Sequence, residues 1–204
     1  MEEYTTLRGV GTFTYEEKKS VFIGEAAPVT TEEEAIARIA SVKKKYSDAN
    51  HHVYAYILRQ NSIMRFSDDR EPQGTAGLPT LDILRKGGIA DAVIVVTRYF
   101  GGTLLGTGGL VRSYTAAAAG AVRAAGIACF SVYVFCEVRL SYADYPKTNG
   151  CFDGDFRLEK TLYDDGVTVC GSLKKEKFDG FCRSLTEATA GRAAVRIVEE
   201  KFDC

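Results

Sequence analysis

Hydrophobic and polar positions at the start of the chain follow two different periods. Apolar residues alternate with polar ones at 9–15 (GVGTFTY) and 20–29 (SVFIGEAAPV), and the charged EEKK between these runs suits a turn, so a β-hairpin is predicted. Apolar residues then recur every three or four positions over 30–48, which predicts a helix. Thr30 and Glu33 have the spacing of a capping box at its start.

The pattern returns to strands after this helix. Residues 51–59 (HHVYAYILR) and 63–67 (IMRFS) are predicted to pair across a short QNS turn. A loop rich in glycine and proline follows, and a short helix should end at Gly87 and Gly88.

The run ADAVIVVTRYF, residues 90–100, is the most strand-like in the chain. It is apolar on both faces, which places it at the centre of its sheet. An alanine-rich helix is predicted to open near Gly108 or Gly109 and to end at Gly126, and its small side chains should allow close packing on that sheet.

Residues 127–204 also alternate between strand-like and helix-like patterns of hydrophobic positions. Strand, short helix, a hairpin with Asp-Gly at its turn, helix and final strand follow one another, which is the βαββαβ plan of ferredoxin-like folds. The sequence therefore predicts an α+β protein with two domains, residues 1–126 and residues 127–204, and a boundary near Gly126.

Composition narrows the class of protein. The chain has 204 residues, 46% of them hydrophobic and 26% charged, and a net charge of -1, so neither disorder nor a strongly basic nucleic-acid-binding surface is expected. The six cysteines lack metal-binding or redox spacing, and no secretory signal or membrane span is evident. We expect reduced thiols, no metal, no cofactor, no membrane contact and a cytoplasmic location.

The stretch VVTRYFGGTLLGTGGLVRSY, residues 95–114, is the strongest candidate for a binding site. Five glycines lie between the central strand and the alanine-rich helix, and they either free backbone N–H groups to bind an anion or only permit a tight crossing. Arg112 lies in the first turn of the predicted helix, where the helix dipole disfavours a cation, so an acidic partner is expected. Arg98 ends the central strand and could reach the same place.

Asp68, Asp69 and Glu71 form a dense acidic cluster in SDDREP. They could bind a divalent cation or act in acid–base chemistry, although a solvated charged turn is the commoner explanation. His51 and His52 begin a strand and must point to opposite faces, so one of them at most could join the acids. From these residues we predict that Glu71 or Asp69 pairs with Arg112 beside the glycines.

Several blocks of the chain resemble one known family. Asp68-Asp69, Glu71-Pro72, the run from Gly74 to Pro79, and the runs VVTRYFGG and LGTGGLVRSY are similar to the signature of the IMPACT family, in particular its bacterial YigZ-type members. That pattern commonly has glycine where this chain has Arg70. Either the tight turn is absent here, or its backbone does not need a positive φ.

The resemblance implies an amino-terminal α+β domain with a fold shared with a ribosomal small-subunit protein, and a carboxy-terminal ferredoxin-like domain similar to one in translation elongation factors. Eukaryotic relatives regulate translation under amino-acid stress. Binding of RNA, the ribosome or a translation factor follows only by analogy of fold.

Two functions of different classes are therefore considered. The first is a non-enzymatic, translation-linked regulator, whose RNA contacts would need a local patch such as Lys174, Lys175 and Lys177, because residues 127–204 hold 11 Lys and Arg against 13 Asp and Glu. The second is an enzyme acting on a small phosphorylated or carboxylated metabolite, although no nucleophile–base pair is recognisable. The sequence does not identify the ligand or the oligomeric state.

For either function, the candidate residues for binding an anion or a partner are Asp68, Asp69, Glu71, Gly74, Thr75, Arg98, Gly101, Gly102, Gly106, Gly108, Gly109 and Arg112.

Overall fold

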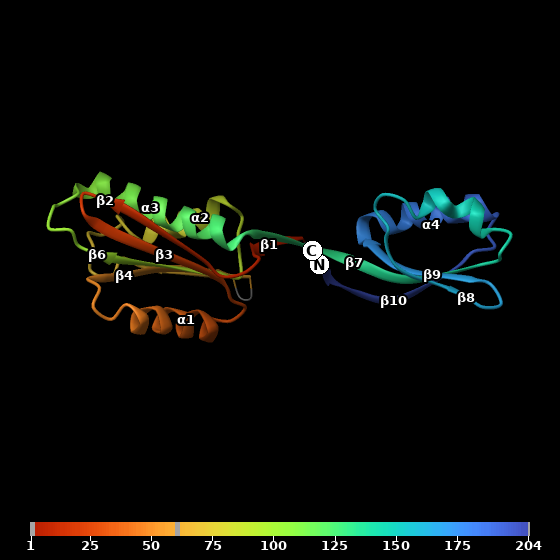
Figure 1. Ribbon diagram of the computed structural model, residues 1–204, viewed down its shortest axis with the longest axis horizontal. Helices are drawn as coiled ribbons and strands as arrows, with labels where there is room; N and C mark the ends of the chain where they lie inside the picture. The colour runs from red at the N-terminus through yellow and green to blue at the C-terminus, as the bar shows by residue number, and fades with distance from the viewer. Residues whose placement is uncertain (1–2, 60–61, 204) are drawn as a thin grey trace. The chain divides into compact units, whose positions relative to one another are not determined.

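The protein is a mixed α+β structure with two sheets. We describe it from a computed structural model that covers residues 3–59 and 62–203 (Figure 1). Its contacts divide the chain into an amino-terminal unit, residues 4–129, and a carboxy-terminal unit that holds Glu3 and residues 130–203. Folding of residues 127–204 by themselves stays a prediction.

The amino-terminal unit is built on an antiparallel sheet in the order β2-β3-β6-β4-β5. Its strands are β2 (Gly11–Glu17), β3 (Ser20–Pro28), β4 (His51–Leu58), β5 (Ile63–Ser67) and β6 (Ala92–Tyr99), and a short strand β1 (Tyr4–Leu7) precedes them. Its helices are α1 (Glu32–Lys45), α2 (Gly77–Lys86) and α3 (Gly106–Ala125). The predicted pairing of 51–59 with 63–67 is present, while the turn between them includes residues outside the described part of the chain.

β6 lies at the centre of this sheet because both of its faces are buried, as its apolar sequence predicts. Figure 1 shows α2 and α3 on one face and α1 on the other. Val93 and Val95 join the core beneath α1, and Ile94 and Val96 join the core beneath α2 and α3. Because every pair of its strands is antiparallel, the rule that ligands gather at the carboxyl ends of parallel strands does not apply to Arg98.

Two helix starts differ slightly from their predicted positions. The N-cap of α1 is Thr31, whose side chain accepts from the Glu34 backbone N–H, so the capping residues lie one position later than the predicted Thr30 and Glu33. α3 begins at Gly106, two residues before the first predicted start, because glycine at positions 106 and 108 does not prevent the first turn from forming.

Contact between backbones sets the distance of α3 from the sheet. A Cβ on Gly24 of β3 would lie 2.4 Å from the Ala117 carbonyl oxygen of α3. Backbone atoms on both sides leave no flexible group that could move away. The alanines of α3 and this glycine therefore allow the close packing that the sequence predicts.

The carboxy-terminal unit has the element order strand, helix, strand, strand, helix, strand. These are β7 (Ile127–Leu140), the 3₁₀ helix η2 (Tyr145–Cys151), β8 (Arg157–Tyr163), β9 (Val167–Lys174), α4 (Lys175–Thr189) and β10 (Ala194–Asp203). β10, β7, β9 and β8 lie side by side with antiparallel pairing. Aromatic residues of η2 and α4 pack on the β7 and β9 side chains of one sheet face.

We predict that Gly24→Ala lowers the free energy of unfolding by about 1–3 kcal/mol, because the added methyl group would overlap the Ala117 backbone. Urea unfolding followed by circular dichroism measures this change. Gly108→Ala is the matched control, because its Cβ would meet only the Arg112 side chain at 3.5 Å in the first turn of α3. Equal stability of the two variants would contradict the backbone contact.

Candidate functional site

Asp68 anchors the segment between β5 and α2. Its carboxylate accepts hydrogen bonds from the backbone N–H groups of Gly74 at 2.9 Å, Ala76 at 3.0 Å and Gly77 at 2.7 Å. Ala76, the N-cap of α2, has no capping side chain, so Asp68 caps this helix from eight residues earlier in the chain. Thr75 Oγ1 donates to the Pro72 carbonyl at 2.6 Å, which further closes the segment.

Asp69 fixes the next turn to the start of β4. Its carboxylate accepts from the His52 backbone N–H at 2.6 Å, and its carbonyl oxygen lies 2.9 Å from His51 Nδ1. Asp69 and Arg70 have φ values of 43° and 70°, both in the left-handed region. The expectation that the tight turn is absent, or needs no positive φ, is therefore wrong, because Arg70 adopts the backbone that glycine favours.

Glu71 is the centre of a buried polar cluster. Its Oε1 accepts from Arg98 Nη1 at 2.5 Å and from the Tyr114 hydroxyl at 2.7 Å, and His51 Nε2 lies 3.8 Å away. The side chains of Glu71 and Arg98 are only 4% and 6% exposed. The sheet register brings Arg98 beside both His51 of β4 and Phe22 of β3, so three strands and α3 meet at this carboxylate.

The surroundings of this cluster are aromatic. Tyr114 and Phe22 are fully buried and pack edge to face, with ring centroids 5.1 Å apart. Burial, together with the negative charge of Glu71, raises the pKa of Tyr114 far above its ordinary range, so its hydroxyl remains a donor. Arg98 Cζ lies 5.3 Å from the Phe22 ring and 5.5 Å from the Phe100 ring. Among the described residues, no hydrogen-bond acceptor meets its Nε.

Arg112 does not take the predicted acidic partner. It is exposed, and within residues 3–59 and 62–203 its guanidinium makes no ion pair or hydrogen bond. Glu71 pairs with Arg98 and Asp69 with the backbone of β4, so the predicted pairing with Arg112 is wrong. Asp68 caps the start of α2, and the contact of Glu71 with α3 is made through the Tyr114 hydroxyl and not through Arg112. A buried arginine of the central strand has the greater need of a counter-charge.

The glycines from Gly101 to Gly109, here called the glycine loop, have two separate roles. Gly101 packs on the hairpin between β2 and β3, where its Cβ would lie 2.1 Å from the Lys19 backbone carbon, and its N–H donates to Ser20 Oγ at 3.0 Å. Gly102 and Gly106 adopt positive φ values of 82° and 71°. Gly102 and Gly106 thus shape the crossing into α3, and Gly101 allows close backbone contact.

The start of α3 is open to solvent. Its N-cap, Leu105, supplies no side-chain hydrogen bond, no acidic residue lies in its first turn, and Gly108 is exposed. Near it in the sequence are three exposed apolar side chains, Phe100, Leu104 and Val111, which are 45%, 84% and 37% exposed. We call these three side chains and Arg112 the loop surface, and it combines apolar area with one cation.

The three lysines proposed for nucleic acid lie in the carboxy-terminal unit, each near a carboxylate. Lys174 Nζ lies 3.1 Å from Glu3, Lys175 Nζ 2.5 Å from Glu200, and Lys177 Nζ 3.9 Å from Asp155. These contacts reduce the positive charge that the three lysines present together. They belong to a different unit from the glycine loop.

No group of three or more metal-ligating side chains occurs in the described residues. Cys129, Cys136, Cys151, Cys170 and Cys182 are free thiols, while Cys204 lies outside the described residues. Across the same residues, no helix is both long and apolar enough to span a membrane.

Of the two residues that donate hydrogen bonds to Glu71, the sequence analysis included Arg98 but missed Tyr114. Tyr114 and Phe22 were not candidates, although both bear on the buried pair. One signal could have found Tyr114: it lies on the same helical face as Leu110 and Ala117, which predicts burial and hence a partner for its hydroxyl.

Comparison with known proteins identifies the family. Residues 18–122 match the model of the Impact N-terminal domain, so the chain belongs to the IMPACT family. It is 31% identical to the IMPACT family member YvyE of Bacillus subtilis (strain 168), over 96% of this chain and 91% of that protein. It is 42% identical to the IMPACT family member YigZ of Escherichia coli (strain K12), over 56% of this chain and 57% of that protein. A solved structure described as a hypothetical protein is 30% identical, covers 98% of this chain and 100% of its own, and has a TM-score of 0.61.

Replacing Glu71 by glutamine should lower the free energy of unfolding by about 3–5 kcal/mol, because Arg98 would keep a buried charge without its counter-charge. Chemical denaturation measures the loss. The double variant Glu71→Gln/Arg98→Met is the control, and it should recover part of the stability because it removes the unpaired cation. A loss below about 1 kcal/mol for Glu71→Gln would contradict the role of this pair.

His52 should make the stability depend on pH. Burial lowers the pKa of His52, which lies 3.2 Å from Thr97 Oγ1 through Nδ1, and Lys43 and His51 add to this effect while Asp69 opposes it. As pH falls below the ordinary histidine pKa of about 6.5, the unfolded chain takes up a proton more readily than the folded one. The stability that His52 contributes is therefore complete above that pH and is lost toward the lower folded-state pKa.

Urea midpoints measured between pH 7.5 and pH 5 should fall for the wild type. The fall should be shallower for His52→Asn, which cannot take up this proton. Identical slopes for the two proteins would show that His52 is not buried in its neutral form.

Proposed function

We propose that this IMPACT family protein is a non-enzymatic, translation-linked regulator, located in the cytoplasm, that binds RNA, the ribosome or a translation factor through the loop surface. Support comes first from the family, whose eukaryotic members regulate translation. We further propose that the amino-terminal unit shares its fold with a ribosomal small-subunit protein. The carboxy-terminal unit would be a ferredoxin-like module of the kind found in elongation factors, since its strands follow the order β10-β7-β9-β8.

The observation that carries this proposal is the composition of the loop surface. Leu104 is 84% exposed, and the two further apolar side chains and Arg112, which are near it in the sequence, are exposed as well. Exposed apolar groups gathered beside a cation are typical of surfaces that bind macromolecules, where aromatic residues and arginine are enriched. Uncapped N–H groups at the start of α3 add donors for a carboxylate or a phosphate of the partner.

The hydrogen bonds made by Asp68, Asp69 and Glu71 argue against the alternative function, an enzyme that acts on a small metabolite. Asp68 is held by backbone N–H groups of α2, Asp69 by β4, and Glu71 by Arg98 and Tyr114. Each carboxylate therefore has a structural partner within its own unit, which leaves it less available as a catalytic acid or base. The start of α3 could still receive a small phosphate, which the experiment below separates from the regulator.

Full-length protein should co-sediment with ribosomes or shift total cellular RNA at low salt, and Leu104→Asp should weaken this binding about tenfold without a change in melting temperature. Leu104 contributes little to the core, so its replacement tests the surface alone. Ile36→Asp is the matched control, because Ile36 is 56% exposed on α1, on the other face of the sheet.

The dependence of binding on salt concentration distinguishes an RNA or ribosome partner from a protein partner. Contacts with phosphates should weaken steeply between 50 and 200 mM salt, whereas an apolar contact with a protein should weaken little. Wild-type binding that is unchanged in Leu104→Asp would overturn the loop surface as the site. A thermal shift with a phosphorylated metabolite, in the absence of any binding to ribosomes or RNA, would favour the enzyme instead.

A further inference from the structure

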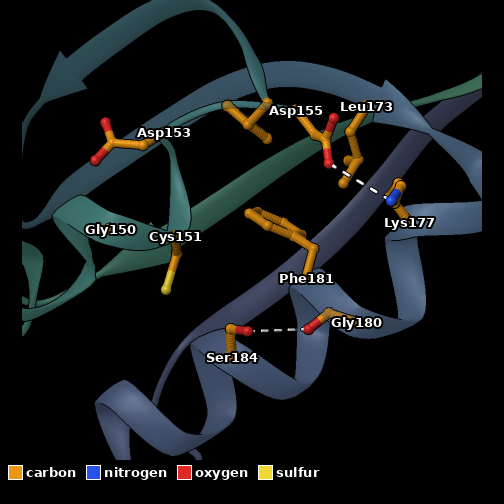
Figure 2. Close-up of a pocket in the computed structure, with 10 residues that line it drawn as sticks. Gly150, Cys151, Asp153, Asp155, Leu173, Lys177, Gly180, Phe181 and Ser184 are labelled. Carbon is orange, nitrogen blue, oxygen red and sulfur yellow. Dashed lines mark hydrogen bonds and ion pairs between the residues drawn. The ribbon is translucent and has the colours of Figure 1, made fainter.

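A small cavity lies in the carboxy-terminal unit, between the end of η2 and α4 (Figure 2). Its volume is about 240 Å³. Pockets that enclose a drug-sized ligand or a cofactor usually hold roughly 300–1,000 Å³. The size of this cavity therefore suits a single side chain of a partner.

The inner wall of the cavity is aromatic. Phe156 and Phe181 stack with ring centroids 5.1 Å apart and an interplanar angle of 16°, and Phe152 packs edge-on against both. Figure 2 shows the Phe181 ring at the centre of the lining, with Cys151 on one side and the Asp155–Lys177 pair on the other. Phe156 and Phe181 are 6% and 7% exposed, so a small part of their ring surface borders the cavity, and a planar cation can pack on it.

The rim carries an excess of negative charge. Asp153 and Asp155 line the cavity together with only one cation, Lys177. Lys177 Nζ lies 3.9 Å from Asp155 Oδ2, and these side chains are 54% and 72% exposed. An ion pair so long and so exposed contributes little free energy, so a better-placed cation can displace Lys177.

We propose that this cavity binds an arginine side chain from a basic segment of a protein partner. The guanidinium group would lie against the Phe181 ring and donate two hydrogen bonds to the Asp155 carboxylate. Arginine fits both contacts because its guanidinium is planar and presents its donors as a fork, whereas a lysine ammonium does neither. The two rim carboxylates repel a phosphate, so the charge favours a protein segment over RNA at this cavity.

This site extends the proposed function by naming the chemistry of one partner, but it does not use the loop surface. It is tested below with small probes and without ribosomes. Failure here would leave binding at the loop surface intact, and failure of Leu104→Asp to weaken ribosome binding would leave this cavity untouched.

The experiment is an NMR titration of the ¹⁵N-labelled full chain with N-acetyl-arginine N-methylamide. We expect saturable shifts in the amides of Gly150, Cys151, Gly180 and Ser184, which line the cavity. The citrulline analogue is the matched probe, because it keeps the shape of arginine without the charge, and it should bind about fivefold to tenfold more weakly.

Two variants that each remove one charge should change the affinity for the arginine probe in opposite directions. Asp155→Asn should weaken arginine binding about threefold to fivefold, because it removes the acceptor charge, and Lys177→Gln should strengthen it, because it removes the competing cation. The proposal is overturned if the citrulline analogue binds equally well, if the two variants change affinity in the same direction, or if oligouridine produces the same shifts more strongly than the arginine probe.

Gly180→Leu should block the cavity while the unit stays folded. Nothing lies within 4 Å of a Cβ built at Gly180, and leucine is favoured over glycine inside a helix. Thr186→Leu is the matched control, an exposed position on the same helix that does not line the cavity. Loss of the shifts in Gly180→Leu but not in Thr186→Leu supports the site, and persistence in both overturns it.

Discussion

The amino-terminal unit depends on one buried ion pair, between Glu71 and Arg98. Arginine at the end of the central strand would be costly to bury alone, and the carboxylate that compensates it comes from a segment without helix or strand. Tyr114 adds a third element to the same oxygen. The position of this irregular segment is therefore fixed by a charge in the sheet and a hydroxyl on α3.

Much of this fold could be predicted from the pattern of the sequence. The first hairpin, α1, the central position of β6 and the order of elements after Gly126 follow from period and turn residues. Pairing of charges could not be predicted in the same way. Arg98 and Arg112 flank the glycine loop and are equally plausible partners in the sequence, and only burial, which depends on how α3 packs on the sheet, decides which arginine receives Glu71.

The left-handed backbone of Arg70 could not be predicted from the sequence either. Arg70 gives no sign of a left-handed φ, since an arginine there favours the ordinary region. The three hydrogen bonds to Asp68 on one side of the turn and the bond from Asp69 to β4 on the other over-determine the chain between them. A residue other than glycine can therefore occupy the turn.

The cap that Asp68 provides for α2 also bears on how this region opens. Asp68, Asp69 and Glu71 hold α2, β4 and the β6–α3 pair respectively, within four consecutive residues. Thermal opening of the segment would release all three contacts in one event. Although residues 68–76 form neither helix nor strand, the hydrogen-bonded amides of Glu71, Gly74 and Ala76 should exchange with solvent more slowly than those of an ordinary surface loop, and a protease should cleave this segment slowly.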